Sequence, residues 1–336
     1  FSALFLFKGN RLLEAHHNES ARASYRSKRD DMREALAKLK QFPTMRERFA
    51  KMPKYTSEGF VETRVRLVEQ MSHVVDKRVV RDAVDNYLNS PTSVLFVLNE
   101  VLSQTSAGGQ SRICSPYLFL ARYEDSDGQV VVDEAADIRA YIDAHPEAEI
   151  EIVTNSAMTS DNFPAQSVID FDTAPRLLLD AELRQRWLDL GSEDETRAEL
   201  TNSDAWKSQV AHPRIRIYQT GLNDSDLFPG GTETYGKLHA KFWLAEPYGF
   251  IGTTNFDYRS RLYNSEMGYV FEAEPLAKDL NAVFEELKSQ SYRWGSPEWL
   301  QMRENLKAAG GIKGQTLRRQ RTIFKTLRAT GLEWEF

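Results

Sequence analysis

Residues 237–266, KLHAKFWLAEPYGFIGTTNFDYRSRLYNSE, bring together the side chains of this sequence that could do chemistry. His239 and Lys241 lie two positions apart in the first apolar run, and Thr253 and Asn255 follow in the second. Near neutral pH a histidine can act as a nucleophile or as a general acid and base. A lysine supplies charge to phosphate oxygens, while hydroxyl and amide groups supply neutral donors. The segment therefore predicts a site that binds a phosphate while a histidine moves a proton or forms a phosphoryl bond.

Two adjacent β-strands would carry these side chains. The first is predicted at 237–245 and the second at 248–255, joined by a tight turn at Glu-Pro-Tyr. His239 and Lys241 are two positions apart, so a strand would present both side chains on one face. Gly252 has no side chain and lets backbone or ligand approach closely. The strands are expected to bring these groups together on one oxyanion, at one edge of the fold.

The remaining sequence alternates predicted strands with predicted helices. Further strands are expected at 111–120, 148–156, 213–221 and 265–273. Helices are expected at 20–40, 63–88, 90–104, 133–144, 175–190, 193–208 and 275–289. Strands that alternate with helices favour an α/β layered fold, and strands apolar on both faces favour cover by helices on both sides. We therefore predict an α/β lobe with a mixed β-sheet flanked by helices on both faces.

Composition limits the classes of function. The 336-residue chain has a formal net charge of −6, which argues against nucleic acid as the main partner because such proteins usually carry a basic surface. Cys114 is the single cysteine, which excludes a disulfide within the chain and a Cys/His metal cluster. We expect a buried thiol at Cys114, no metal and no cofactor. The apolar start, FSALFLF, is too short to span a bilayer.

The segment 237–266 resembles the HKD motif of the phospholipase D superfamily, H-x-K-x4-D followed by G-S-x-N. The matching positions are His239, Lys241, Gly252, Thr253 and Asn255, with threonine in place of the serine. Glu246 stands where the family has aspartate, which keeps the carboxylate and lengthens it by one methylene. The resemblance implies catalytic roles for four residues, His239, Lys241, Asn255 and Glu246. It also implies phosphate binding by Lys241, Thr253 and Asn255, with Gly252 in support.

The resemblance extends on both sides of this motif. NFDYRSRLYNSE is similar to the N-x-D-x-R-S-x-x-x-N-x-E tail of the bacterial cardiolipin synthase branch, which adds Arg259, Asn264 and Glu266 as supporting residues. Upstream, ICSPYLFL resembles the family segment I-x-S-P-Y-F-x-P. IVTNSAMTSD resembles V-x-T-N-S-x-x-x-x-D and adds Asn155 in support. The similarity covers residues 70–290 and implies a phospholipase D-like lobe, nearest to bacterial cardiolipin synthase-like phosphatidyltransferases.

The family resemblance implies a second motif that this chain does not show. Family members pair two HKD motifs, and one histidine forms a phosphohistidine while the other acts as acid and base. The other histidines have no lysine two positions on; they are His16, His17, His73, His145 and His212. Each is interpreted as a surface or capping residue. We therefore expect residues 1–69 to be a helical linker after an absent N-terminal lobe, with His239 as the acid and base.

That expectation extends to the surface and activity of the chain. A missing lobe would have covered an apolar edge around the motif, made by Phe242, Trp243, Phe256 and Tyr258. Alone, the chain is expected to be inactive on phosphatidylglycerol, unless two copies pair their His239 residues.

The C-terminal segment 291–336 is predicted to be a basic helical tail. Between Asn305 and Thr330 there are seven basic residues and no acidic one: Lys307, Lys313, Arg318, Arg319, Arg321, Lys325 and Arg328. Leu317, Phe324 and Leu327 would share one face of a helix. Two interpretations stay open at this point. The helix binds an anionic membrane surface, or its apolar face packs on the body of the protein.

Three hypotheses of function follow. The leading one is a phosphatidyltransferase or phospholipase D that moves a phosphatidyl group through a phosphohistidine to an alcohol or water. Its partners would be a phosphatidylglycerol-like phospholipid, the N-terminal HKD lobe and a bacterial membrane surface, at which the protein would be peripheral. The second is a nuclease-like phosphodiesterase, which the acidic charge and the tail motif disfavour. The third is a non-catalytic lobe, which the intact His239, Lys241 and Asn255 disfavour.

Overall fold

The computed structural model of the chain describes residues 61–70, 94–104, 109–124, 127–190, 194–221, 238–262, 264 and 266–332, and five single residues before position 61. The chain divides into two compact units, residues 1–62 and 63–336, and every element described below lies in the second. Of the helix predicted at 20–40, the described residues Asp30, Arg33, Glu34 and Ala37 are helical. His16, His17 and His73 lie outside the described residues.

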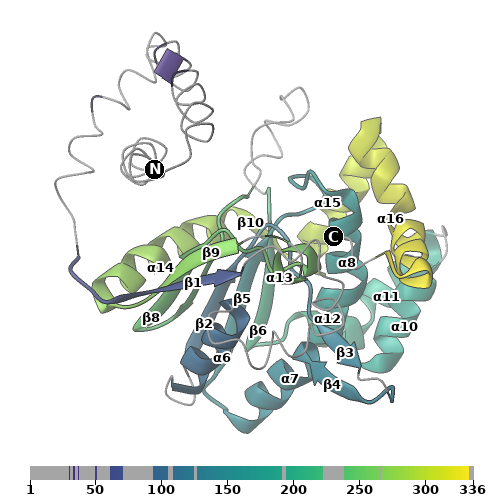
Figure 1. Cartoon of the computed structure of the whole chain (residues 1–336). Coiled ribbons are helices and arrows are strands. Elements are labelled where there is room, and N and C mark those ends of the chain that lie inside the picture. Colours follow the sequence, from purple (N-terminus) through teal and green to yellow (C-terminus); the bar gives the residue numbers. More distant parts are fainter. Residues whose placement is uncertain are drawn as a thin grey trace. The chain divides into compact units, whose positions relative to one another are not determined.

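An eight-stranded mixed β-sheet is the centre of the second unit (Figure 1). Its strands, in spatial order, are β1 (Val65–Gln70), β9 (Glu266–Glu272), β8 (Tyr248–Gly252), β7 (Phe242–Ala245), β2 (Gln110–Cys114), β5 (Glu149–Thr154), β6 (Ile215–Thr220) and β10 (Ser291–Arg293). The β2–β5 and β5–β6 pairs are parallel, and all other neighbouring pairs are antiparallel. The predicted mixed sheet is confirmed. β3 (Arg122–Glu124) and β4 (Val130–Asp133) form a separate antiparallel pair.

Helices cover both faces of this sheet, as predicted. α6 (Val94–Gln104) packs on one face against Trp243, and α14 (Glu274–Ser289) packs on the other against Phe242 and Leu244 (Figure 1). Consecutive residues of a strand point to opposite faces, which explains this division along β7. Because both faces are covered, β7 is the continuous apolar run FWLA rather than an alternation of apolar and polar residues.

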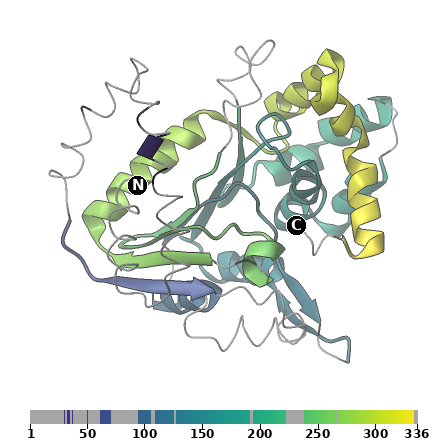
Figure 2. The same ribbon diagram turned by 45° about the horizontal axis from the view of Figure 1, so that its top comes forward.

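Most of the remaining helices gather beside β5 and β6 and build the largest part of the core. They are α7 (Glu134–Ala144), α8 (Phe163–Val168), the π-helix η1 (Ile169–Thr173), α9 (Ala174–Leu178), α10 (Ala181–Asp189), α11 (Asp194–Asn202), α12 (Asp204–Val210), α15 (Pro297–Ala309) and α16 (Gly311–Thr330). Figure 2 shows α15 and α16, in yellow, on the side of the lobe where the teal helices lie. Four buried tryptophans join them, Trp187, Trp206, Trp294 and Trp299, with neighbouring ring centroids 5.1 to 6.3 Å apart.

A buried carboxylate, Asp170 of η1, ties the C-terminal helices to this core. It is fully buried and accepts hydrogen bonds from Arg303 at 2.7 Å and from Gln320 at 2.8 Å. Gln219 and Gln166 donate to its other oxygen at 2.8 and 3.2 Å. A buried charge is tolerated when it is paired and hydrogen-bonded in this way. Since Arg303 lies on α15 and Gln320 on α16, the carboxylate holds both helices against the lobe.

The apolar face of α16 also packs inward. Leu317, Phe324 and Leu327 are all buried. Of the two interpretations that the sequence left open for this helix, the burial favours packing of this face on the body. The helical prediction for the tail is confirmed at α15 and α16, while the domain boundaries after residues 69 and 290 stay predictions.

Several predicted elements differ from the structure. The strand predicted at 111–120 ends at Cys114, and the helices predicted at 175–190 and 193–208 are each divided in two. Two differences are larger. The helix predicted at 63–88 is wrong for Val65–Gln70, which forms β1 and pairs with β9. That partner lies far along the chain, and strand formation depends strongly on such context. The strand predicted at 237–245 begins only at Phe242. The backbone of Leu238 is bonded to a side chain instead of a neighbouring strand.

Candidate active site

The predicted site residues gather at one end of the sheet. β7 runs antiparallel to β2 and Cys114 lies opposite Phe242, so the carboxyl end of β2 meets the amino end of β7. The carboxyl end of β5 lies beside that of β2, since these two strands are parallel. The backbone N–H of Gly252, at the end of β8, donates to the carbonyl of Lys241 at 3.1 Å. This end is called the motif end, and it is marked by Cys114, Thr154, His239, Gly252 and Glu266.

His239 and Lys241 differ in exposure at the motif end. The His239 side chain is exposed, whereas Lys241 is only 8% exposed. The Lys241 ammonium donates to the carbonyl oxygen of His239 at 2.8 Å. Burial lowers the pKa of Lys241, and the carboxylates of Glu266 and Asp257 oppose this shift. The arrangement sets a buried cation beside an accessible imidazole, which suits the recognition and transfer of a phosphate.

Glu266 is the carboxylate around which the supporting contacts form. It is buried, and the Thr253 hydroxyl donates to one of its oxygens at 2.5 Å. The Asn264 amide donates to the other oxygen at 3.2 Å. A hydroxyl has one proton to donate, so Thr253 orients Glu266 in this structure. Its predicted contact with phosphate stays a prediction and requires that the hydroxyl turn away from the carboxylate.

Asn255 brings a polar atom without a partner to the motif end. Among the described residues, nine buried side-chain polar atoms have no hydrogen-bond partner, and three fall on Thr254, Asn255 and Ser260. Leaving such a group unpaired costs about 1–3 kcal/mol. The free atom of Asn255 is Oδ1, an acceptor, and a half-turn of the amide would put the donor Nδ2 in its place. Asn255 is therefore ready to bond a ligand.

A Tyr117–Asp161 pair and the carboxylate of Asp257, to which the sequence analysis gave no role, also lie at the motif end. The Tyr117 hydroxyl donates to Asp161 at 2.5 Å, and burial, helped by Asp161, raises the pKa of Tyr117. Asp257 is buried and accepts from the backbone N–H of Ser260 at 2.7 Å. Asp257 and Asp161 both act electrostatically on Lys241. The sequence signal for Tyr117 and Asp161 was their place in the two upstream segments that resemble the family, ICSPYLFL and IVTNSAMTSD.

Asn155 is brought to the site as well. It follows β5 directly, is 1% exposed, and its side chain bonds the backbone of Leu238, the residue before His239. The resemblance predicted a supporting role for Asn155, and its position agrees with one.

Glu246 is not brought to His239. Glu246 is exposed in the turn after β7, so the whole strand, about 13 Å at 3.3 Å per residue, lies between it and Lys241. Arg259 is exposed on the short helix α13 (Tyr258–Leu262), where its carbonyl accepts from the Asn264 N–H at 2.8 Å. The place of Glu246 gives its predicted catalytic role no support.

The apolar edge expected around the motif is absent among the described aromatic residues of this segment. Phe242, Trp243 and Tyr258 are buried, and Phe256 is partly buried against the core. They pack inward because β7 has helices on both faces and Phe256 pairs with Leu118 next to β2. That prediction is wrong for these side chains.

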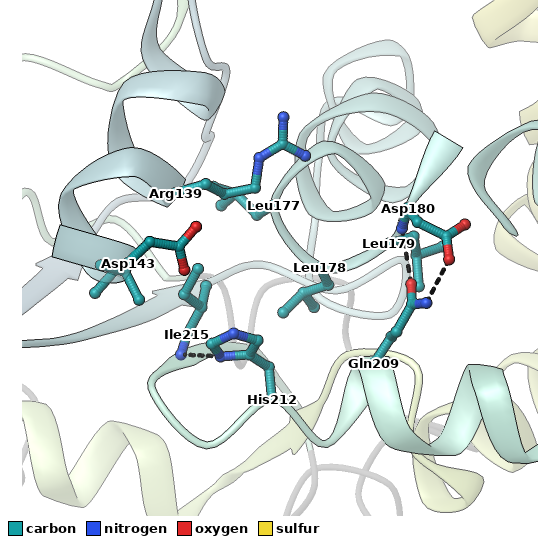
Figure 3. A pocket seen from close by; sticks show the side chains of 10 residues that line it. Arg139, Asp143, Leu177, Leu178, Leu179, Asp180, Gln209, His212 and Ile215 are labelled. Carbon is teal, nitrogen blue, oxygen red and sulfur yellow. Dashed lines mark hydrogen bonds between the residues drawn. The ribbon is translucent and has the colours of Figure 1, made fainter. Parts of the chain in front are cut away.

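A pocket of about 220 Å³ lies at the opposite end of the sheet, beside the start of β6 (Figure 3). Ile142, Asp143, Leu178, His212 and Ile215 are among the residues that line it. Nδ1 of His212 accepts the backbone N–H groups of Arg214 and Ile215 at 3.2 and 2.9 Å. Burial lowers the pKa of His212, and Arg214 adds to the shift. His212, interpreted from the sequence as a surface or capping residue, thus bonds the backbone that leads into β6. This region is called the pocket end.

Three other features describe the chemistry open to the chain. Among the described residues, no group of three His, Cys, Asp or Glu side chains is placed to hold a metal ion. No helix in the same part of the chain is long and apolar enough to cross a membrane. Cys114 is buried as predicted, and burial raises its pKa to about 12. Its thiol therefore stays protonated and is not a nucleophile.

Comparison with known protein families gives a match over the part of the chain that holds this site. Residues 103–288, more than half of the 336, match the family described as cardiolipin synthase, PLD-like domain. The chain belongs to this family. The match includes β2, β5 and the strands of the motif end, so the resemblance to phospholipase D-type proteins is confirmed. The chain is thereby a member of a family of enzymes.

One curated relative and two solved structures illustrate the similarity. Cardiolipin synthase C of Escherichia coli (strain K12) is 32% identical over 107 residues, which are 28% of this chain and 23% of that protein. Phosphatidylserine synthase of Haemophilus influenzae Rd KW20 is 11% identical, covering 87% of this chain and 54% of that one, with a TM-score of 0.43. The phospholipase D family member Nuc of Salmonella typhimurium is 13% identical, covering 70% and 100%, with a TM-score of 0.33. The chain thus matches under a quarter of the length of its curated relative.

Proposed function

We propose that the chain is one catalytic lobe of a phospholipase D-type phosphatidyltransferase of the cardiolipin synthase kind. The observation that carries this proposal is the exposed imidazole of His239 beside the buried ammonium of Lys241, within the segment that matches the family. A phosphodiester of a phospholipid is the substrate class that this pair and the family match favour. The products would belong to phospholipid biosynthesis.

His239 serves as the general acid and base in this proposal. In the first step, a histidine of a second HKD motif attacks the phosphorus of phosphatidylglycerol, and the bond from phosphorus to the head-group oxygen breaks. His239 gives its proton to that oxygen, and glycerol leaves. In the second step, an acceptor hydroxyl attacks the phosphohistidine, its proton passes to His239, and the P–N bond breaks. A positioned acid and base of this kind contributes about 100- to 10,000-fold.

Lys241 and Asn255 would bind the phosphate oxygens during both steps. The buried ammonium stabilises the charge of the pentacoordinate phosphorus, and in a desolvated site such a contact is stronger than in water. Asn255 would add a neutral donor through its amide. Because side chains supply the charge, we expect transfer to continue in EDTA.

The second histidine comes, in this proposal, from an N-terminal HKD lobe of the same protein. A nucleophile and a proton donor must stand on opposite sides of the phosphorus, and one histidine rarely serves both. The exposed side chain of His239 is compatible with a facing lobe. A second copy of the chain, contributing its own His239, is the other possible source.

We further propose that the protein acts as a peripheral protein at a bacterial membrane. Its substrate resides there, and Arg318, Arg319 and Lys325 are exposed on α16. Since the apolar face of this helix is buried, the attraction would be electrostatic, about 1 kcal/mol for each basic residue near an anionic surface.

The test measures conversion of phosphatidylglycerol to cardiolipin and glycerol by the chain alone and after addition of the N-terminal lobe. We expect no turnover from the monomeric chain, turnover with both lobes, and its loss in His239→Ala. Full activity of a monomeric preparation would overturn the two-lobe mechanism. Cleavage of oligonucleotides with no action on phosphatidylglycerol would overturn the substrate class in favour of the nuclease alternative.

A further inference from the structure

The backbone immediately before His239 leaves the β-ladder although it is buried. Residues 238–241 belong to no strand, and β7 begins at Phe242. Leu238 is nevertheless only 7% exposed. Buried backbone N–H and C=O groups need partners, because an unpaired one costs as much as a lost hydrogen bond. The position of His239 therefore depends on what replaces the missing strand partner.

The side chain of Asn155 supplies both replacement bonds. Its Oδ1 accepts the N–H of Leu238 at 3.0 Å, and its Nδ2 donates to the carbonyl of the same residue at 3.2 Å. A carboxamide has the same donor and acceptor as a peptide group, so it pairs with Leu238 as a neighbouring strand would. Asn155 is 1% exposed, which shields both bonds from competing water.

Asn155 is itself anchored at the parallel part of the sheet. It is the first residue after β5, which pairs in parallel with β2 and β6. Its Nδ2 also donates to the carbonyl of Pro116, after β2, at 3.2 Å. The Thr154 hydroxyl donates to the same carbonyl at 3.1 Å. Asn155 thus connects two parallel strands to the segment that carries His239.

The other side of His239 is fixed by Lys241. The carbonyl of Lys241 accepts the N–H of Gly252 at 3.1 Å, and its ammonium bonds the carbonyl of His239. His239 therefore lies between a clamp at Leu238 and a clamp at Lys241, and within these four residues only its side chain is exposed. A shift at Leu238 would move the imidazole relative to the ammonium.

We propose that Asn155 is the positioning residue of His239, setting the imidazole against the Lys241 ammonium through its two bonds to Leu238. The expected loss of phosphatidyl transfer rests on the proposed function. The expected displacement of the imidazole does not. A displacement of about 1 Å in a reacting group can cost about 100-fold in rate. The predicted defect lies in turnover and not in substrate affinity, because Asn155 is 1% exposed and its amide already bonds the backbone of Leu238 and Pro116.

The test compares three variants in the two-lobe assembly. Asn155→Ala removes both bonds to Leu238, and Asn155→Asp keeps the acceptor for its N–H but loses the donor to its carbonyl. Thr154→Val is the matched control: it is equally buried and removes only the bond to Pro116. We expect kcat to fall about 100-fold in Asn155→Ala and less in Asn155→Asp, with little change in KM. Thr154→Val should stay near the wild-type kcat.

A second measurement decides the matter even if no transfer is found in the wild type. In protein labelled with ¹³C-histidine, the resonance of His239 is identified by its loss in His239→Asn. It should shift or broaden in Asn155→Ala and Asn155→Asp, while Thr154→Val leaves it in place and the His145 resonance stays fixed in all three. An unchanged His239 resonance in Asn155→Asp would overturn the proposal. So would a Thr154→Val defect as large as that of Asn155→Ala. Circular dichroism checks that each variant is folded. If Asn155→Ala does not fold, the comparison of Asn155→Asp with Thr154→Val tests the proposal.

Discussion

The two ends of the sheet each hold a histidine, yet only one end is suited to catalysis. At the pocket end, His212 is half-buried and its Nδ1 accepts two backbone N–H groups. At the motif end, His239 is exposed beside the ammonium of Lys241 and the unpartnered oxygen of Asn255. The cavity at the pocket end is lined by five buried leucine and isoleucine side chains and by five polar or charged ones.

This difference lies in the polar groups that remain able to bond a ligand. At the pocket end the polar groups already bond one another: Gln209 and Asp180 exchange two hydrogen bonds at 2.6 and 2.7 Å. A ligand there would have to break existing bonds. At the motif end the free amide oxygen and the exposed imidazole gain bonds when a ligand arrives, so binding carries less cost.

The largest expected effect separates the two histidines. His239→Ala should lower kcat for phosphatidyl transfer by about 100- to 10,000-fold, because the general acid and base is lost. The matched change at the pocket end is His212→Asn, whose amide oxygen can still accept the N–H groups of Arg214 and Ile215. It should leave kcat unchanged. Initial rates with both lobes present check this, and equal losses in the two variants would contradict the comparison.

The next largest difference in transfer rate is expected between variants of two side-chain amides, Asn255 at the motif end and Gln209 at the pocket end. Asn255→Ala should cost about 2.7–4 kcal/mol of transition-state stabilisation if its amide contacts the phosphate oxygens. Gln209→Ala removes an amide that is already fully bonded, so transfer should proceed at the wild-type rate. The measurement is kcat/KM for both variants at one pH. An active Asn255→Ala enzyme would mean that its free oxygen binds something other than the reacting group.

The sequence predicted the elements of the motif end well where local pattern decides structure. β5, β6, β8 and β9 all lie within predicted strands, because each is an apolar run between turn residues or helices. β1 was missed because its partner β9 is distant in sequence. The π-helix η1 was not predicted either, and its Asp170 bonds side chains of α15 and α16, more than 130 positions away. Both are decided by tertiary contacts.

The site residues also divide into those that the local sequence identifies and those that tertiary contacts place. Residue types and spacing were enough to find His239, Lys241 and Asn255. They could not show that Lys241 is buried, since burial follows from tertiary packing. The place of Glu246 beyond β7, by contrast, agrees with the turn predicted at Glu-Pro-Tyr. The two bonds of Asn155 to Leu238 join residues 83 positions apart, a pairing that no local pattern reveals.

The pH dependence of transfer should report on the buried lysine. Burial lowers the pKa of Lys241, so its ammonium loses its proton at a lower pH than that of an exposed lysine. Phosphate binding needs the charged form, and kcat/KM should therefore fall about tenfold per pH unit once the pH exceeds that lowered value. Lys241→Arg, which stays protonated, should be slower at neutral pH but should lack this alkaline decline. An identical decline in the arginine variant would assign it to another group.

The pocket-end histidine should respond to acid through stability instead. The pKa of His212 is lower in the folded protein than in the unfolded chain, so the unfolded chain binds protons more readily. Stability should fall as the pH drops below about 6.5, the ordinary histidine value, and continue to fall until the lowered value is passed. Protonation at Nδ1 breaks two backbone hydrogen bonds, worth about 1 kcal/mol each. Urea unfolding at pH 7 and pH 5 should show a smaller acid loss in His212→Asn, and an equal loss would contradict this account.

The smallest expected effect concerns the two glutamates at opposite ends of β7 and β8. Glu246→Gln changes an exposed side chain in the turn beyond β7, so transfer should stay within about twofold of the wild type, as for most surface substitutions. Glu266→Gln removes a buried charge that accepts from Thr253 and Asn264 and opposes the lowered pKa of Lys241. It should reduce kcat/KM by about tenfold, the scale of one charge-assisted hydrogen bond. Its alkaline decline should also move to lower pH, because Lys241 would then lose a stabilising neighbour. A larger loss of kcat/KM in Glu246→Gln than in Glu266→Gln would contradict this prediction. It would mean that the Glu246 carboxylate contributes to transfer from its place in the turn.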